Sequence, residues 1–546
     1  MWRRDEPVRR LTTGAVVLVV VLAGLLVPGR AGATIFGVAD NHPRYAADGG
    51  AYFFSLLDDL GFTADRVTLL WNADAPAAIP DAEGMDRMLP QAATHGIEIM
   101  VGLYPARAKS LDERPDAPAQ FAAWAAKVAR RFPQVHRFVI GNEFNQPRFL
   151  QPQFRPDCTR ASGAAYLKLL SLSYDALKAV NPAITVVTSV SSRGNDNCRA
   201  SSNVSTSPYR FIYDMGAAYR AMGRTSPAWD EWGIHAYPNS PTDPLERGFR
   251  WPNIGLPNFG RLRQALWDAF ATTPQPTFGS LRFGTGLGAL GQPKITVPET
   301  GWQTAVPQSS RGAYFGRETD QTTSDATQAD IYAQIVRTVP CDPDVRELLF
   351  FGLYDEPDLA RLQTGLIRAD GTRKPSYDAV KRALAETRGR CQSASASWTP
   401  TTSVVGAHVD FDGLRPRWWK ERYWALTVGA EEEATYRAGV FRVPGPRLGD
   451  ARSAALWRAA AGSGGWKPVL ARDGCIKEYW SPLVRFDARR LRPGYYVYAV
   501  QVAATMNPAR TTTFTSKPFR VLPRPRPVPP RRGRYHASKR GVAQPG

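Results

Sequence analysis

Two glutamates stand where an apolar stretch of the chain turns polar. Glu143 ends the run Phe138-Val-Ile-Gly-Asn142-Glu143, and Glu299 ends the run Ile295-Thr-Val-Pro-Glu299. A short apolar run that ends on a polar residue is typical of a buried strand whose last residues reach solvent. Two carboxyl groups held near each other suit acid–base chemistry, because one can carry a proton while the other stays ionised.

Cleavage of a glycosidic bond has this requirement. One carboxyl group protonates the leaving oxygen, and the other attacks the sugar or activates a water molecule. A single glutamate at a strand end would be weak evidence, since such positions often carry solvated acids. The pair, with Asn142 directly before Glu143, favours a glycoside-cleaving site.

The elements that must position these residues follow an alternating pattern. From residue 34 to about residue 384, short apolar runs alternate with amphipathic helical stretches, as in successive βα units with a parallel sheet. The eight runs are 35–40, 66–71, 97–104, 137–143, 184–190, 232–237, 295–299 and 348–354. Eight such units predict a (β/α)8 TIM barrel, whose active site lies at the C-terminal ends of the strands.

The pattern changes after the predicted barrel (34–390). Residues 391–406 are rich in Ser, Ala and Thr and are interpreted as a linker. Strand-like runs at 423–428, 436–443 and 495–502 follow, with little helical periodicity. Residues 407–522 are therefore predicted to form a smaller all-β, sandwich-like accessory domain.

The two ends of the chain predict export and a charged tail. Four early arginines, an apolar run from Ala15 to Val27 and the sequence Ala31-Gly-Ala33 indicate a signal peptide over residues 1–33. We expect a secreted protein without a stable membrane span after cleavage, because 13 apolar residues are short of the roughly 20 that a span needs. Residues 523–546 form a basic, Pro-rich tail, interpreted either as a solubilising segment or as a contact to an anionic cell-envelope polymer.

The net charge of +20 does not indicate a nucleic-acid partner. Residues 1–33 contribute +3 and residues 523–546 contribute +7, so half of the excess lies at the ends. No recognition motif accompanies the rest. The expected partner is a carbohydrate substrate.

The five cysteines fit an oxidising compartment, and none has the close spacing of a metal or redox motif. We expect pairs Cys158–Cys198 and Cys341–Cys391, with Cys475 left over; the sequence alone does not fix this connectivity. No metal and no cofactor is expected.

The strand-end residues resemble clan A of the glycoside hydrolases, with families 39 and 5 the nearest. Members of this clan place an Asn-Glu acid/base after the fourth strand and a Glu nucleophile after the seventh. Gly141-Asn142-Glu143 and Pro298-Glu299-Thr-Gly-Trp302 match these positions. The resemblance implies Glu143 as acid/base, Glu299 as nucleophile, Asn142 as partner of the sugar 2-hydroxyl, and retention of configuration.

The resemblance extends to other strand ends. The segment Gly233-Ile-His235-Ala-Tyr237-Pro is similar to the sixth strand of the clan, where a His or Tyr contacts the nucleophile and substrate, and Tyr237 would orient Glu299. Tyr354 stands where many members carry a Trp on the eighth strand. Arg66 resembles a clan arginine near the nucleophile, although it lies at the start of its run.

Four further aromatic or acidic side chains are candidate sugar contacts: Trp302 in the seventh-strand motif, Trp71 and Tyr104 at the second and third strand ends, and Asp40 at the first. Core packing is an equal alternative for Trp71 and Tyr104, and a simple turn for Asp40. Asp355 and Glu356 could line the same site or be solvated loop acids. An inactive barrel that only binds carbohydrate at the cell envelope is the alternative function.

Overall fold

The structure, a computed structural model, describes residues 32–279, 293–393, 398–411, 423–446 and 468–523. Nearly all of the predicted signal peptide, and the predicted tail from residue 524, lie outside the described residues. The predicted linker is described except for residues 394–397. Among the described residues, no helix combines the length and apolar character needed to cross a membrane.

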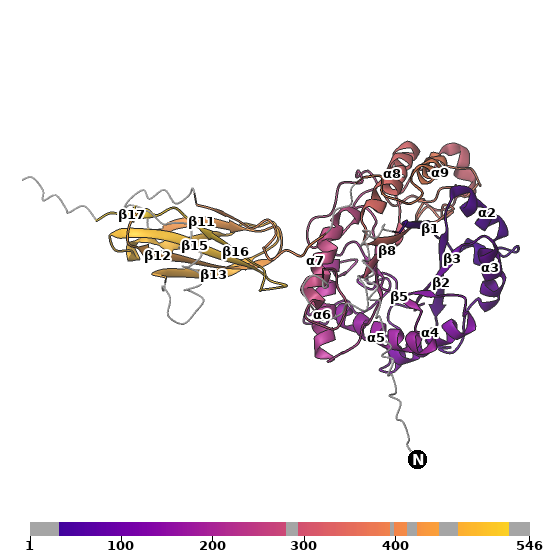
Figure 1. Cartoon of the computed structure of the whole chain (residues 1–546), viewed down its shortest axis with the longest axis horizontal. Helices are drawn as coiled ribbons and strands as arrows, with labels where there is room; N and C mark the ends of the chain where they lie inside the picture. The colour runs from indigo at the N-terminus through magenta and orange to yellow at the C-terminus, as the bar shows by residue number, and fades with distance from the viewer. Residues whose placement is uncertain (1–31, 280–292, 394–397, 412–422, 447–467, 524–546) are drawn as a thin grey trace, which may run out of the picture.

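The N-terminal part is a closed parallel barrel surrounded by helices (Figure 1). The fifth barrel strand is in two pieces, β5 and β6, and the pairing of β5 with β4 and β7 closes the ring at eight strand positions. The predicted (β/α)8 barrel is therefore confirmed. Its strands are β1 (Ile35–Ala39), β2 (Ala64–Trp71), β3 (Glu98–Pro105), β4 (Arg137–Ile140), β5 (Thr185–Val187), β6 (Val190–Ser191), β7 (Glu231–His235), β8 (Lys294–Thr300) and β9 (Val345–Phe351).

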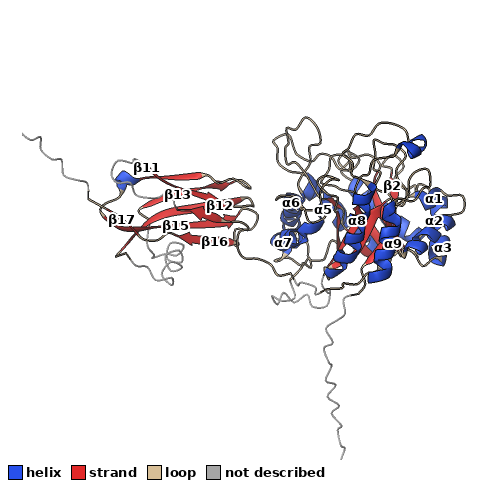
Figure 2. Cartoon of the chain, turned by 90° about the horizontal axis from the view of Figure 1, so that it is seen from above, coloured by secondary structure: helices blue, strands red, loops and turns tan. Residues whose placement is uncertain are grey.

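Helices form the outer layer around these strands (Figure 2). In α4, the side chains of Phe121, Trp124 and Val128 fall on one face and are buried against the barrel. Proline at the first turn begins α9, where its missing N–H costs no hydrogen bond. The helices are α1 (His42–Tyr45), α2 (Ala51–Leu60), α3 (Ala82–Thr94), α4 (Ala117–Arg131), α5 (Ser162–Val180), α6 (Pro208–Ala221), α7 (Phe259–Phe270), α8 (Asp325–Thr338) and α9 (Pro375–Thr387).

A buried arginine closes the barrel interior at the strand starts. The Arg137 guanidinium donates to Glu231 at 2.5 Å and to Glu347, and all three side chains are buried. Thr296 adds a hydroxyl within 3.2 Å of the same guanidinium. These polar groups are paired with one another at the end opposite the predicted active site.

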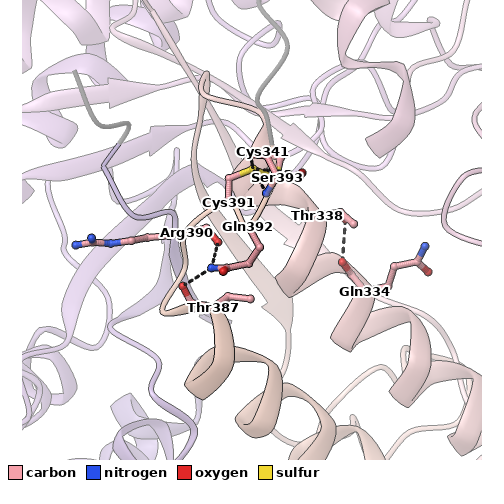
Figure 3. The surroundings of a disulfide bond; sticks show 8 residues. All are labelled: Gln334, Thr338, Cys341, Thr387, Arg390, Cys391, Gln392 and Ser393. Atoms are coloured by element: carbon pink, nitrogen blue, oxygen red, sulfur yellow. Dashed lines mark hydrogen bonds between the residues drawn. A yellow bond between two sulfur atoms is a disulfide. The ribbon is translucent and has the colours of Figure 1, made fainter. Parts of the chain in front are cut away.

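Both predicted disulfides are present. Cys158–Cys198 joins the loop after β4 to the loop after β6. Cys341–Cys391 joins the short helical turn after α8 to the segment after α9, and Figure 3 shows it beside Ser393. Cys475 is unpaired and exposed.

The C-terminal part is a second, all-β unit, as predicted from the sequence. One sheet has the order β10-β11-β14 and the other the order β13-β12-β15-β16, with β17 also paired to β15. The two sheets enclose a core of their own, which includes Leu426, Val440 and Val500. The strands are β10 (His408–Asp410), β11 (Tyr423–Gly429), β12 (Ala434–Val443), β13 (Leu470–Ile476), β14 (Leu483–Asp487), β15 (Gly494–Ala504), β16 (Thr511–Thr515) and β17 (Phe519–Val521).

Candidate active site

Glu143 lies in the loop directly after β4, on a constrained backbone. Its φ is 45°, a left-handed conformation that a long side chain rarely adopts. Two hydrogen bonds fix this turn: the Glu143 N–H donates to Ser189 Oγ at 3.2 Å, and the Gly141 N–H donates to Leu103 O at 2.8 Å. Strain that is held by its surroundings in this way is concentrated at functional sites.

Glu299 is the next-to-last residue of β8, and its carboxylate has fixed donors. Arg66 donates one guanidinium nitrogen to Glu299 Oε1 and the other to Asn142 Oδ1 at 2.9 Å. Tyr237 donates its hydroxyl to Glu299 Oε2 at 3.0 Å. Residues from β2, β8 and the segments after β4 and β7 thus meet at one point.

These contacts set the charge of Glu299. Burial alone would raise its pKa, but His235, Arg66 and the Tyr237 hydroxyl together bring the pKa below the ordinary glutamate value. Burial raises the pKa of Tyr237 well above that of a free tyrosine, and the nearby Glu299 and Glu143 carboxylates raise it further. Tyr237 therefore remains a proton donor to an ionised Glu299.

His235, the last residue of β7, contacts both glutamates. Its Nδ1 lies 3.2 Å from Glu143 Oε1 and 3.3 Å from Glu299 Oε2, and the ring is fully buried. These two carboxyl oxygens can be no farther apart than the sum of the two distances, which is 6.5 Å. On the other side of the ring, Nε2 lies 3.1 Å from Ser189 Oγ.

Gly102 makes room for the Arg66 side chain. In the β2–β3 register Gly102 stands opposite Thr68, two residues beyond Arg66, so the guanidinium climbs along the inner wall of the barrel to reach Glu299. A Cβ atom at Gly102 would lie 2.9 Å from an Arg66 nitrogen. Arg66 lies near the start of β2, but its long side chain can therefore still reach Glu299 near the C-terminal end of β8.

No family model and no curated protein matches the chain. Solved structures that align with it include a family 39 glycoside hydrolase from Bacteroides cellulosilyticus WH2, with 19% identity over 76% of this chain and 73% of that chain and a TM-score of 0.43.

Two other similar structures are also glycoside hydrolases. A GH5_18 variant from Streptomyces cattleya in complex with Manb1-4GlcNAc has 17% identity over 68% of this chain and 84% of that chain, with a TM-score of 0.44. A monomeric β-xylosidase from Caulobacter crescentus CB15 has 15% identity over 87% of this chain and 98% of that chain, with a TM-score of 0.40.

The structure does not bring every candidate residue to the glutamates. Trp71 is fully buried, with its ring against Phe121 and its indole N–H donated to Pro76 O. Trp302 is 2% exposed, packs on Tyr332 and donates to Asp243 O. Neither ring offers a face to a sugar, because both belong to the layer between strands and helices.

The candidate residues that follow the first and last barrel strands make contacts with neighbouring parts of the barrel. Asp40 uses its carboxylate to accept backbone N–H groups of His42 at 2.9 Å and Leu353 at 2.8 Å, so it ties β1 to the end of β9. Tyr354 is half-buried with its ring 4.8 Å from that of His42. Asp355 is buried in an ion pair with Lys374 at 2.6 Å, which assigns it a structural role.

Two residues at the site were not identified from the sequence. Ser189 follows β5 and contacts both the Glu143 N–H and His235, but a serine after an apolar run is too common to be informative. Gly102 lies inside a strand, and a glycine at that place does indicate a close approach of another group.

Tyr104, on the same face as Gly102, is close enough to Arg66 and Glu299 for their charges to act on its pKa, which burial raises.

Proposed function

We propose that the protein is a retaining glycoside hydrolase that cleaves O-glycosidic bonds of a poly- or oligosaccharide, with Glu299 as nucleophile and Glu143 as acid/base. The observation that carries this proposal is the single His235 nitrogen in contact with both carboxyl groups. Retaining enzymes hold their carboxyl groups about 5–5.5 Å apart, and inverting enzymes about 6.5–9.5 Å apart to admit a water molecule. The upper limit of 6.5 Å between the two oxygens favours retention.

The environments of the two glutamates support their different roles. Glu299 faces a guanidinium and a phenol, which stabilise its anion. Among the described residues, no lysine or arginine pairs with the Glu143 carboxyl group, whose side-chain partner is His235. We therefore assign the proton-transfer role to Glu143, since Glu299 is the carboxylate that a guanidinium contacts.

The reaction then has two steps. A Glu299 oxygen attacks the anomeric carbon, the glycosidic C–O bond breaks, and Glu143 gives its proton to the departing oxygen. Glu143, now ionised, removes a proton from water, whose oxygen attacks the same carbon and releases Glu299 from the ester. In this mechanism Asn142, whose Oδ1 accepts a hydrogen bond from Arg66, binds a hydroxyl of the sugar.

The direct test compares two variants on aryl glycosides. We expect Glu299→Gln to lose turnover by at least roughly a thousandfold, because no covalent intermediate forms. We expect Glu143→Ala to keep formation of the intermediate from a substrate with a good leaving group, so that added azide accelerates release and gives a glycosyl azide. NMR of the first product anomer would read retention directly.

The same experiments distinguish a glycoside hydrolase from a non-catalytic barrel that only binds carbohydrate. Wild-type protein that binds glycans but releases no reducing ends from any of them would overturn the enzymatic proposal. Normal turnover by Glu299→Gln would overturn the assignment of the nucleophile. No observation in the described residues favours the binding-only function.

We also propose that the protein is secreted. The two disulfides support an oxidising compartment, and the apolar segment before Thr34 supports export. Contact of the basic tail with an anionic envelope polymer is part of the same proposal. Cell fractionation with and without residues 524–546 tests it, since loss of envelope retention is expected only without the tail.

A further inference from the structure

The β-sandwich contacts the barrel at the loops that follow β6 and β7. Arg210, in the first turn of α6, pairs with Asp196 of the loop after β6 at 2.6 Å. The same guanidinium lies 3.3 Å from Glu433 and 3.4 Å from Glu478, both of the sandwich. One arginine therefore links an active-site-side loop to two acids of the accessory domain.

A second contact involves the loop between β13 and β14. Tyr479 accepts the backbone N–H of Trp251 at 2.8 Å, and the Arg250 guanidinium stacks over its ring at 4.3 Å. Trp251 and Arg250 lie on the segment that leaves the site at Tyr237. Tyr479 has a φ of 56°, an unfavourable conformation for a bulky residue, and these barrel contacts hold it there.

Trp480 comes next and is 55% exposed. Within the described residues no aromatic or cationic side chain covers its ring, and its backbone N–H bonds to Lys477 O. It stands three residues before β14, which pairs with β11. In Figure 2 the long loops of the barrel lie at the top, and β11 lies along the upper edge of the sandwich.

We propose that Trp480 is a distal sugar-binding residue for an extended polysaccharide chain, and that the ion pairs around Arg210 fix its position relative to the two glutamates. An exposed indole ring offers a flat apolar face of the kind that packs on the C–H face of a pyranose. Leu483, three residues further along the chain, is also exposed, at 52%. This inference rests on the proposed function for its substrate class.

The test compares polymer with small substrate. Wild type, Trp480→Ala and Trp480→Phe are assayed on soluble xylan, mannan, glucan and arabinan, and on an aryl glycoside. For the polymer that wild type cleaves, we expect Trp480→Ala to lower kcat/KM roughly three- to tenfold through KM. Trp480→Phe, which keeps a stacking ring, should restore most of the loss. Aryl glycoside kinetics should stay unchanged in both.

A matched control and a binding assay complete the design. Val469 is an exposed apolar residue at the other end of β13, so Val469→Ala should leave polymer kinetics unchanged. Affinity electrophoresis of the Glu299→Gln protein, with and without Trp480→Ala, measures polymer binding apart from turnover. Equal polymer kinetics and equal binding with and without the indole would overturn the inference while the proposed function stands. Failure of wild type to cleave any glycan would instead overturn the proposed function.

Discussion

At the scale of residues, the site is built from a contrast in the neighbours of two chemically identical side chains. Arg66, Tyr237 and His235 converge on Glu299, whereas His235 is the one of these three that also contacts the Glu143 carboxyl group. Buried donors act more strongly than they would in water, because the surrounding dielectric is low. The proposed roles of nucleophile and acid rest on this difference between the neighbours of the two glutamates.

Arg66 should control the acid limb of the pH profile. The proposed mechanism needs ionised Glu299, and Arg66 is one of the groups that lower the pKa of Glu299. In Arg66→Met this pKa rises, so we expect the acid limb of kcat/KM to move to higher pH and activity at pH 5 to fall more than activity at pH 7. The measurement is kcat/KM on an aryl glycoside from pH 3 to 8.

A surface arginine provides the control for this prediction. Arg107 pairs with Asp74 and Glu113 in a half-exposed cluster, so Arg107→Met should leave the profile in place. If the acid limb of kcat/KM in Arg66→Met is unchanged or moves to lower pH, the role given to Arg66 is wrong.

The residues at the site could be predicted only in part, and strand geometry explains the difference. Glu143, Glu299 and Tyr237 end apolar runs, so their type and place were informative. Trp71 ends a run as well, but it lies five residues after Arg66, and alternating side chains of a strand put residues an odd number apart on opposite faces. With Arg66 inside the barrel, Trp71 faces the helices.

At the scale of elements, the strands do more than carry side chains to one end. The parallel register of β2 and β3 places Gly102 where the Arg66 guanidinium passes, and the break between β5 and β6 places Ser189 beside His235. All eight apolar runs could be predicted because each is short and ends on polar residues. The break in the fifth strand could not, since Thr188 and Ser189 interrupt the apolar pattern only briefly.

Gly102→Ala should damage catalysis more than folding. The new methyl group would lie 2.9 Å from the end of a long side chain, which can move aside without rebuilding the barrel. The displaced guanidinium would no longer fit both Glu299 and Asn142, and we expect kcat/KM to fall roughly ten- to hundredfold. Parallel measurement of kcat/KM and Tm checks this, and a large loss of Tm with normal activity would contradict it.

The polar closure of the barrel interior predicts a pH-dependent loss of stability. Arg137→Met leaves Glu347 buried without its cation and leaves Glu231 with only Arg346, at 3.6 Å. We expect a cost of about 3–5 kcal/mol at pH 7. Burial raises the pKa of Glu347, so its protonated form is favoured in the fold and the cost should shrink as pH falls. Chemical denaturation at pH 7 and pH 5 measures this.

Arg131→Met is the control for that measurement. Arg131 forms an exposed pair with Asp86, and such pairs contribute about 0–1 kcal/mol. Two results would contradict the stabilising role given to Arg137. One is an unfolding free energy of Arg137→Met equal to that of Arg131→Met. The other is a difference between wild type and Arg137→Met that is larger at pH 5 than at pH 7.

At the scale of the whole molecule, the contact between barrel and sandwich could not be foreseen from the sequence. Its central residue, Arg510, lies in the turn between β15 and β16 and is buried, with Asp268 of α7 at 2.7 Å and Glu432 of the sandwich beside it. Asp268 precedes Arg510 by 242 residues. Local patterns reveal each unit's core but carry no information on which charges meet across so long a separation.

Arg510→Met should therefore separate the unfolding of the two units. Removal of the guanidinium leaves Asp268 and Glu432 facing each other in a buried contact, which we expect to cost about 3–5 kcal/mol. Calorimetry should show one transition becoming two, with the sandwich melting first because its core is the smaller. Arg437, an exposed arginine of β12 paired with Asp473, gives the matched control Arg437→Met. A single unshifted transition in Arg510→Met would mean that the two units are held together by other contacts, such as those around Arg210.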